Sequence, residues 1–210
     1  MKKKYYCLWI LLGMLVGCML LVGCGQKKSD NTDDESYSGE LMSGKHHVEI
    51  SVEDFGVMEV ELDADSAPIT VTNFCKLANE GFYDGLTFHR IISGFMVQGG
   101  DPDGNGMGGS DETIKGEFSD NGVENTLSHT RGAISMARSQ NMNSASSQFF
   151  IVHEDSTYLD GSYAVFGYVT EGIEVVDALA EYAETKDTDS NGMFTNTADQ
   201  PVIEYIKVLD

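Results

Sequence analysis

Apolar and polar residues alternate over residues 47–52 and 57–62, and further short strand-like stretches recur to the end of the chain. An alternation with a period of two predicts β-strands that bury one face and expose the other. Asp54-Phe55-Gly56 separates the first two stretches, and these residue types suit the turn of a hairpin. The predicted strands cover residues 47–52, 57–62, 88–92, 95–98, 132–137, 148–152, 164–169 and 202–209.

Two other stretches repeat their apolar residues with the period of a helix. The first opens at Ser66, which suits the N-cap, and Pro68 suits the first turn, where a missing N–H does no harm. Gly81 is expected to end this helix, and the second covers residues 173–180. Eight short strands with two helices predict a mainly β domain that closes into a barrel, since closure removes exposed sheet edges.

The N-terminal segment has a different pattern. Lys2-Lys3-Lys4 and the long apolar run after them match the positive and hydrophobic regions of a secretory signal. The run ends in Leu21-Val22-Gly23-Cys24, which resembles a bacterial lipobox, in which the cysteine is lipidated and becomes the new N-terminus. Cys18 follows a second Leu-Val-Gly, and an uncleaved membrane anchor is a further alternative. The polar sequence directly after Cys24 favours Cys24.

We therefore expect a lipoprotein signal peptide over residues 1–23, a lipidated Cys24 with a flexible acidic tether over 24–45, and a folded domain over 46–210. The tether has no apolar period and cannot bury enough surface to fold. This organisation predicts an extracytoplasmic protein that is held to the membrane of a bacterial surface or envelope by its lipid alone.

The chain is strongly acidic, with 34 acidic against 13 basic residues and a net charge of −21. Removal of the three signal lysines leaves ten basic residues against 34 acidic ones, or −24. Such a charge argues against nucleic-acid binding and against adhesion to anionic lipid, and it favours solubility. Cys75 is the one cysteine of the expected domain, so no internal disulfide or cysteine zinc site is available there, and it is expected to be a small buried residue.

Two segments imitate a calcium-binding loop. Residues 101–112 satisfy the spacing of acidic, amide and glycine residues, but a predicted strand precedes them and Gly108-Gly109 occupies an apolar position of such loops. Asp187-x-Asp189-x-Asn191-Gly192 lacks the closing acid, because Ala198 stands at that position. We therefore expect no metal site.

Three segments carry most of the functional signal: FHRIISGFMVQGGD at residues 88–101, RGAISMAR at 131–138, and SQFFI at 147–151, the last continued by LDG at 159–161 and VFG at 165–167. In order and spacing they resemble the cyclophilin family of peptidyl-prolyl cis-trans isomerases, over residues 46–210. The resemblance implies an eight-stranded antiparallel barrel capped by two helices and binding of proline-containing polypeptides.

The chemistry of this reaction needs little from a protein. Amide resonance sets a barrier of about 18–20 kcal/mol to rotation of an X-Pro bond. In the rotated state the prolyl nitrogen regains its lone pair, so a directed hydrogen-bond donor and an apolar slot for the ring suffice, without nucleophile, metal or cofactor. Arg90, always charged and rigidly forked, is the natural donor, and the resemblance makes it the catalytic arginine.

The resemblance also assigns the substrate-binding residues. Gln98 is expected to order Arg90 and contact the substrate carbonyl, and His89 adjoins the site. The proline pocket is expected to comprise Phe95, Met96, Phe149 and Leu159, and the rim that grips the substrate backbone Ala137, Arg138, Ser139 and Gln148. Phe88, Phe150 and Phe166 are assigned to the core, and His129 to packing or capping.

Tyr158 and Tyr163 complete the expected substrate-binding residues. Together with Arg138 they depart from the best-known family members, which carry Trp at Tyr158, His at Tyr163 and Asn at Arg138. The Tyr158 difference is expected to weaken cyclosporin binding. The leading function is isomerisation of X-Pro bonds in exported proteins, assisting their folding, by a monomer. The alternatives are a proline-peptide binding module or holdase that uses the same groove, and a structural surface protein with an inert barrel.

Overall fold

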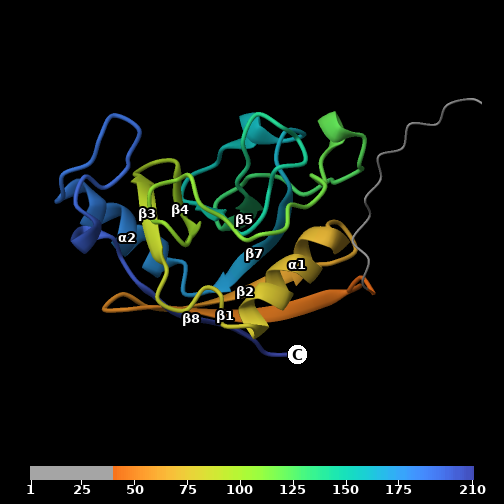
Figure 1. Ribbon diagram of the computed structural model, residues 1–210, viewed down its shortest axis with the longest axis horizontal. Helices are drawn as coiled ribbons and strands as arrows, with labels where there is room; N and C mark the ends of the chain where they lie inside the picture. Colours follow the sequence, from red (N-terminus) through yellow and green to blue (C-terminus); the bar gives the residue numbers. More distant parts are fainter. Residues whose placement is uncertain (1–39) are drawn as a thin grey trace, which may run out of the picture. The chain divides into compact units, whose positions relative to one another are not determined.

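The computed structural model describes residues 40–210, so the signal segment, Cys24 and most of the expected tether lie outside the described residues. This part of the chain forms one sheet and two α-helices, which lie at opposite ends of the sheet (Figure 1). The strands are β1 (Lys45–Val52), β2 (Gly56–Asp63), β3 (Thr87–Ile92), β4 (Met96–Asp101), β5 (Ala133–Met136), β6 (Phe149–Val152), β7 (Val165–Glu171) and β8 (Ile203–Val208). The helices are α1 (Pro68–Asn79) and α2 (Glu174–Glu184), and the second extends four residues beyond its predicted end.

The eight strands are antiparallel and follow the order β3-β4-β6-β5-β7-β2-β1-β8. The two end strands meet only where they begin, through the Thr87–Val202 bridge and the bond from Phe88 N to the Pro201 carbonyl. Beyond that point the free edge of β3 pairs with residues 191–194 instead of β8. The prediction of a closed barrel was therefore overstated, since the sheet is a curled half-barrel.

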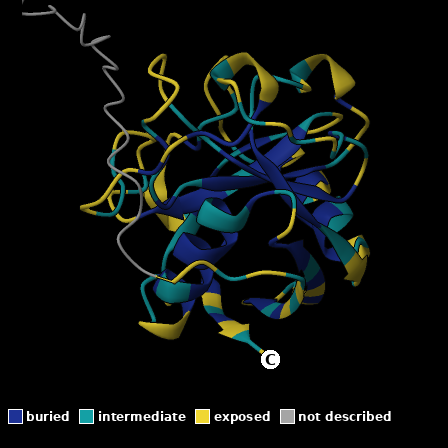
Figure 2. Ribbon diagram, turned by 90° about the vertical axis from the view of Figure 1, so that its right-hand side faces the viewer, coloured by how far each residue is buried: buried dark blue, intermediate teal, exposed yellow. Residues whose placement is uncertain are grey.

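Strand alternation builds the main core on the inner face of the curl. Val48 and Ile50 of β1 face Val60 and Met58 of β2, and all four are fully buried. Figure 2 shows the buried segments gathered in the strands and the exposed ones in the loops. Cys75 of α1 is buried in this core, as predicted, and burial raises the pKa of its thiol to about 12.

A second, smaller apolar cluster lies apart from the main core. It comprises Met96, Ala133, Phe150, Val152 and Val165, with Phe95, Leu159 and Tyr163 partly buried against it. These residues come mainly from β4, β5, β6 and β7, so this part of the sheet is apolar on both faces.

The first helix does not begin as predicted. Ala67 precedes it and no side chain of the local sequence caps it, so the assignment of Ser66 as N-cap was wrong. The buried carboxylate of Glu117 accepts from Ile69 N at 3.0 Å, Thr70 N at 2.8 Å and Thr70 Oγ1 at 2.7 Å. A distant acid therefore satisfies the orphan N–H groups of the first turn. Gly81 follows the helix with a φ of 70°, as expected of a terminating glycine.

Within residues 40–210, no helix combines the length and the apolar character that crossing a bilayer would need.

Candidate active site

A row of paired residues crosses four neighbouring strands. Arg90 of β3 is the register partner of Gln98 on β4, Gln98 is the partner of Phe150 on β6, and Phe150 is the partner of Ser135 on β5. Directly opposite residues of an antiparallel pair share one face of the sheet. The strand pairing therefore brings together a charged donor, an amide and an aromatic ring from segments up to 60 residues apart.

Beside this row lies a cavity of about 160 Å³. It is lined by Arg90, Phe95, Met96, Gln98, Ala137, Arg138, Phe150, Leu159 and Tyr163. Pockets for drug-sized ligands span roughly 300–1,000 Å³, so this one suits a single side chain or ring. Its lining combines apolar side chains with the guanidinium groups of Arg90 and Arg138, so it fits an apolar ring attached to a polar bond.

The Arg90 guanidinium is held from two sides. Its Nη1 donates to Gln98 Oε1 at 3.0 Å, and its Nε donates to the Asn191 carbonyl at 2.8 Å. Gln98 Nε2 donates in turn to Gln148 Oε1 at 2.9 Å, and Gln148 Nε2 to the Gly108 carbonyl at 2.8 Å. Among the described residues, Nη2 of Arg90 has no hydrogen-bond partner, so it is free to donate to a substrate.

The electrostatics of the arginine follow from its position. Partial burial lowers the pKa of Arg90, and the nearby Asp189 carboxylate opposes that shift. An arginine remains protonated at neutral pH despite such a shift. The cavity edge therefore carries a fixed positive charge.

Phe149 and Phe150 exchange the places that we predicted for them. Phe149 is fully buried in the main core, where its ring contacts those of Phe74, Tyr83 and Phe88 edge-on. Phe150 lines the cavity instead of the core. Successive side chains of a strand point to opposite faces of the sheet. The prediction was one residue out of place, so it assigned the core residue to the cavity and the cavity residue to the core.

Three further predicted contacts, Ser139, Gln148 and Tyr158, do not line this cavity. Ser139 and Gln148 line a neighbouring, mostly polar cavity of about 190 Å³, which shares Gln98, Ala137 and Arg138 with the first. Tyr158 is 73% exposed, and its ring centroid lies 6.1 Å from that of Phe95, so it lies on the surface beside the cavity residue Phe95.

His89 is fully buried and lines neither cavity, which contradicts its prediction as a substrate contact. Burial lowers the pKa of its imidazole. Neither ring nitrogen has a hydrogen-bond partner among the described residues. The side chain therefore packs as a neutral ring beneath the site.

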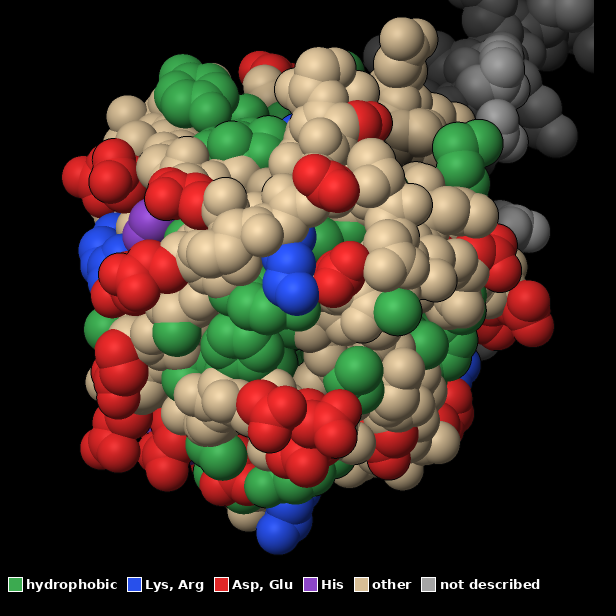
Figure 3. All heavy atoms as spheres, turned by 90° about the vertical axis from the view of Figure 1, so that its left-hand side faces the viewer, with side chains coloured by type: hydrophobic (Ala, Val, Ile, Leu, Met, Phe, Trp, Pro, Cys, Tyr) green, Lys and Arg blue, Asp and Glu red, His purple; other side chains and the backbone are tan. Residues whose placement is uncertain are grey.

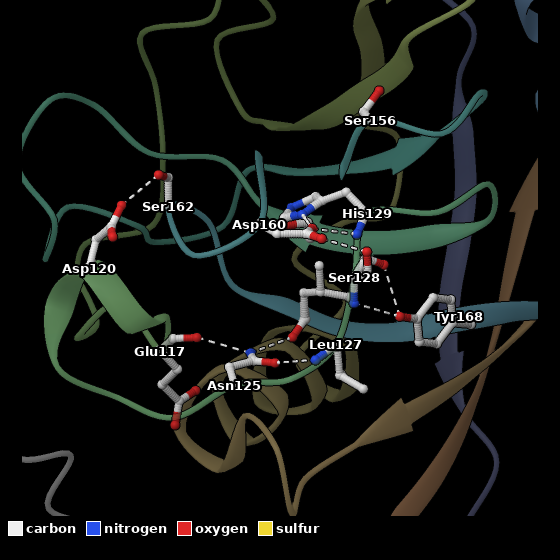
Figure 4. A network of polar contacts seen from close by, with 12 residues as sticks. Glu117, Asp120, Asn125, Leu127, Ser128, His129, Ser156, Asp160, Ser162 and Tyr168 are labelled. Carbon is white, nitrogen blue, oxygen red and sulfur yellow. Dashed lines mark hydrogen bonds and ion pairs between the residues drawn. The ribbon is translucent and has the colours of Figure 1, made fainter. Parts of the chain in front are cut away.

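The buried His129 packs against Phe150 and belongs to a network of polar contacts that includes Asp160 (Figure 4). The His129 ring stacks on Phe150 with centroids 5.9 Å apart and planes 12° from parallel. Its Nδ1 lies 2.7 Å from Asp160 Oδ1, and its Nε2 lies 3.0 Å from Ser135 Oγ. A carboxylate only accepts, so Nδ1 carries the proton and Nε2 accepts from the serine hydroxyl. Burial lowers the pKa of His129, which packs as expected.

Arg138 is fixed between the two cavities. Its guanidinium donates twice to the Ser162 carbonyl and once to the Ser139 carbonyl. The same group lies 5.0 Å from the Phe118 ring centroid and 4.6 Å from that of Tyr163. Two of the positions that depart from the best-known family members, Arg138 and Tyr163, thus contact each other and form one wall.

The first calcium-like segment has a structural role. The buried Asp101 carboxylate accepts from the backbone N–H groups of Asp103, Asn105 and Gly106, which shapes the loop after β4. No group of three or more metal-ligating side chains is positioned to hold an ion among residues 40–210.

Figure 3 shows acidic side chains spread over the face at the left of Figure 1, with few lysines and arginines among them. This face therefore lacks the basic character that phosphate contacts need.

The curled antiparallel sheet thus presents a small cavity with a fixed guanidinium at its edge, a site that fits one apolar ring beside a charged hydrogen-bond donor. The chain belongs to the cyclophilin family: the family model described as cyclophilin type peptidyl-prolyl cis-trans isomerase/CLD matches residues 47–206.

Relatives agree with this assignment. Peptidyl-prolyl cis-trans isomerase B of Bacillus subtilis is 53% identical over 123 residues, which cover 59% of this chain and 82% of the relative. Peptidyl-prolyl cis-trans isomerase A of Dickeya dadantii is 40% identical over 157 residues, covering 70% of this chain and 76% of that protein. A crystal structure of a Cryptosporidium parvum cyclophilin in the presence of the dipeptide Ala-Pro has a TM-score of 0.67 at 30% identity, covering 78% of this chain and 99% of that one.

Proposed function

We propose that this chain is a peptidyl-prolyl cis-trans isomerase in which Arg90 is the catalytic residue. The observation that carries the proposal is the free Nη2 of Arg90 beside an apolar cavity of about 160 Å³. The proline ring enters the cavity between Phe95, Met96, Phe150 and Leu159.

Rotation of the bond proceeds without a covalent step. As the amide twists, resonance is lost and the prolyl nitrogen becomes a hydrogen-bond acceptor. The guanidinium donates to that nitrogen only in the twisted state, so it stabilises the transition state more than either ground state. Gln98 keeps one amide hydrogen available after its bond to Gln148, and it can hold the substrate carbonyl.

The test is Arg90→Ala, measured with a proline-containing peptide in a coupled isomerisation assay on the purified full-length chain. Removal of one transition-state donor typically costs roughly 100-fold or more in rate. Arg131→Ala is the matched control, because that exposed arginine binds Asp177 and lies outside the cavity. Activity within twofold of the wild type in Arg90→Ala would exclude the catalytic role. Unchanged peptide binding in the inactive variant, with cellular function intact, would favour the binding module or holdase instead.

We further propose that the protein is a lipoprotein anchored through Cys24, with its isomerase domain outside the cytoplasm. The Leu-Val-Gly-Cys motif and the polar segment after it support this location, where the enzyme assists folding of exported proteins. Cys24→Ala should release the protein from the membrane fraction and remove the lipid mass, while Cys18→Ala should change neither. Retention of the lipid in Cys24→Ala would refute the assignment.

We also propose that the enzyme is a monomer. Sedimentation of the full-length protein in detergent checks this expectation.

A further inference from the structure

Arg90 lies on β3. The edge of β3 that does not pair with β4 is covered by the loop at residues 187–196. Arg90 is bridged to Met193, Ile91 N donates to the Gly192 carbonyl at 2.9 Å, and Phe194 N donates to the His89 carbonyl at 3.2 Å. This loop contains the second calcium-like motif, Asp187-x-Asp189-x-Asn191-Gly192. Neither the fold nor the proposed reaction explains this motif.

The motif folds around a single carboxylate. Asp189 Oδ1 accepts from Asn191 N at 2.7 Å and from Met193 N at 3.0 Å. Asp189 N donates to the Met193 carbonyl at 2.8 Å, and Gly192 N donates to the Asp189 carbonyl at 3.0 Å. These bonds close a tight turn, and the backbone bonds to the carboxylate hold the pKa of Asp189 below its usual range.

The turn lies directly against β3. Gly192 has a φ of 80°, and a Cβ there would stand 2.6 Å from the Ile91 carbonyl oxygen, so no larger residue fits. In this position the Asn191 carbonyl accepts from Arg90 Nε at 2.8 Å.

We propose that Asp189 is a positioning residue, which holds the Arg90 guanidinium in its catalytic orientation by fixing the turn that presents the Asn191 carbonyl. The inference rests on the proposed function of Arg90. With Nε and Nη1 both bonded, the guanidinium plane is fixed and Nη2 has one direction. Without the turn, only Gln98 restrains the side chain.

The hydrogen bonds, and not the charge, carry this effect. Asp189 is exposed, so solvent and salt screen its attraction to Arg90. An asparagine at this position keeps an oxygen that accepts the same two N–H bonds but has no charge. The two contributions can therefore be separated by substitution.

The experiment compares Asp189→Ala, Asp189→Asn and Asp187→Ala in the full-length protein. Asp187→Ala is the matched control, because it removes one acid from the same loop. The Asp187 carboxylate has no hydrogen bond among the described residues. Because misplacement of a catalytic group costs up to about 100-fold, partial loosening in Asp189→Ala should lower kcat about five- to tenfold with KM within about twofold. Asp189→Asn and Asp187→Ala should stay within twofold of the wild type.

A second readout does not depend on activity. The Arg90 Nε–H signal in a ¹⁵N NMR spectrum should exchange with water at least fivefold faster in Asp189→Ala and be unchanged in Asp187→Ala. In an Arg90→Ala background, Asp189→Ala should cause no further loss of kcat/KM, because Asp189 acts through Arg90.

Three results would overturn the inference: full activity in Asp189→Ala, equal losses in Asp189→Asn and Asp189→Ala, or a further loss in the Arg90→Ala background. An inactive wild type, or an active Arg90→Ala, would instead refute the proposed function. The two failures are therefore distinguishable in one set of assays.

Discussion

Phe149 and Phe150 provide a matched pair for testing where the site ends and the core begins. They are neighbours in β6 with the same side chain, but Phe149 belongs to the main core and Phe150 lines the cavity. Substitution of each by alanine should therefore affect different properties. Phe149→Ala should reduce stability, and Phe150→Ala should mainly reduce activity.

The magnitudes follow from the surroundings of each ring. Phe149 is fully buried among three aromatic rings, and a core Phe→Ala change costs about 3–5 kcal/mol. A domain of this size shifts its Tm by about 2–4 °C per kcal/mol, so Phe149→Ala should melt roughly 6–20 °C lower. Phe150 borders a cavity, so its loss should cost less, about 1.5–3 kcal/mol, although its ring still stacks on His129.

Catalysis should show the opposite order. Removal of the wall that packs against the proline ring should lower kcat/KM by about tenfold or more, as changes in apolar specificity pockets do. Phe149→Ala should keep kcat/KM per folded molecule within about threefold of the wild type.

The measurements are thermal unfolding by circular dichroism and the coupled isomerisation assay below the melting range of both variants, corrected for the folded fraction. Phe149→Leu replaces Phe149→Ala if the latter does not fold. A larger catalytic loss in the Phe149 variant than in Phe150→Ala would refute this account of β6.

Three further outcomes are expected. Arg138→Ala should raise KM several-fold in the isomerisation assay, because the guanidinium that stacks on Tyr163 no longer fixes the cavity wall; an unchanged KM would contradict this role. Burial lowers the pKa of His129, so as pH falls below about 6.5 the unfolded chain binds a proton that the folded chain excludes, and stability decreases. The Tm should therefore fall between pH 7 and 5, and a fall of the same size in His129→Gln would contradict this cause. Tyr158→Trp should tighten cyclosporin binding measured by calorimetry, whereas equal affinity in both proteins would show that this exposed position is not limiting.

Alternation predicted β1 and β2, which expose polar residues on one face, and short strand-like segments predicted the other strands and the mainly β class. It could not say which of two adjacent phenylalanines faces the core, since both faces of β6 are apolar. The partly open sheet and the Glu117 cap depend on contacts between distant segments, which local patterns do not encode. The motif predicted that Arg90 and Gln98 lie together at the site, and both line the cavity. The Asn191 contact is made by a backbone carbonyl, so no side-chain pattern could have predicted it.

The acid that completes the start of α1 lies 47 positions after Thr70 in the chain. During synthesis the helix therefore emerges well before the residue that stabilises its first turn. Short isolated helices are marginal in water, so this segment cannot become firmly helical on its own. The first turn of α1 can be stabilised only after the segment that contains Glu117 has been synthesised. Premature cleavage or pausing before residue 117 would leave α1 incompletely folded and accessible to proteases.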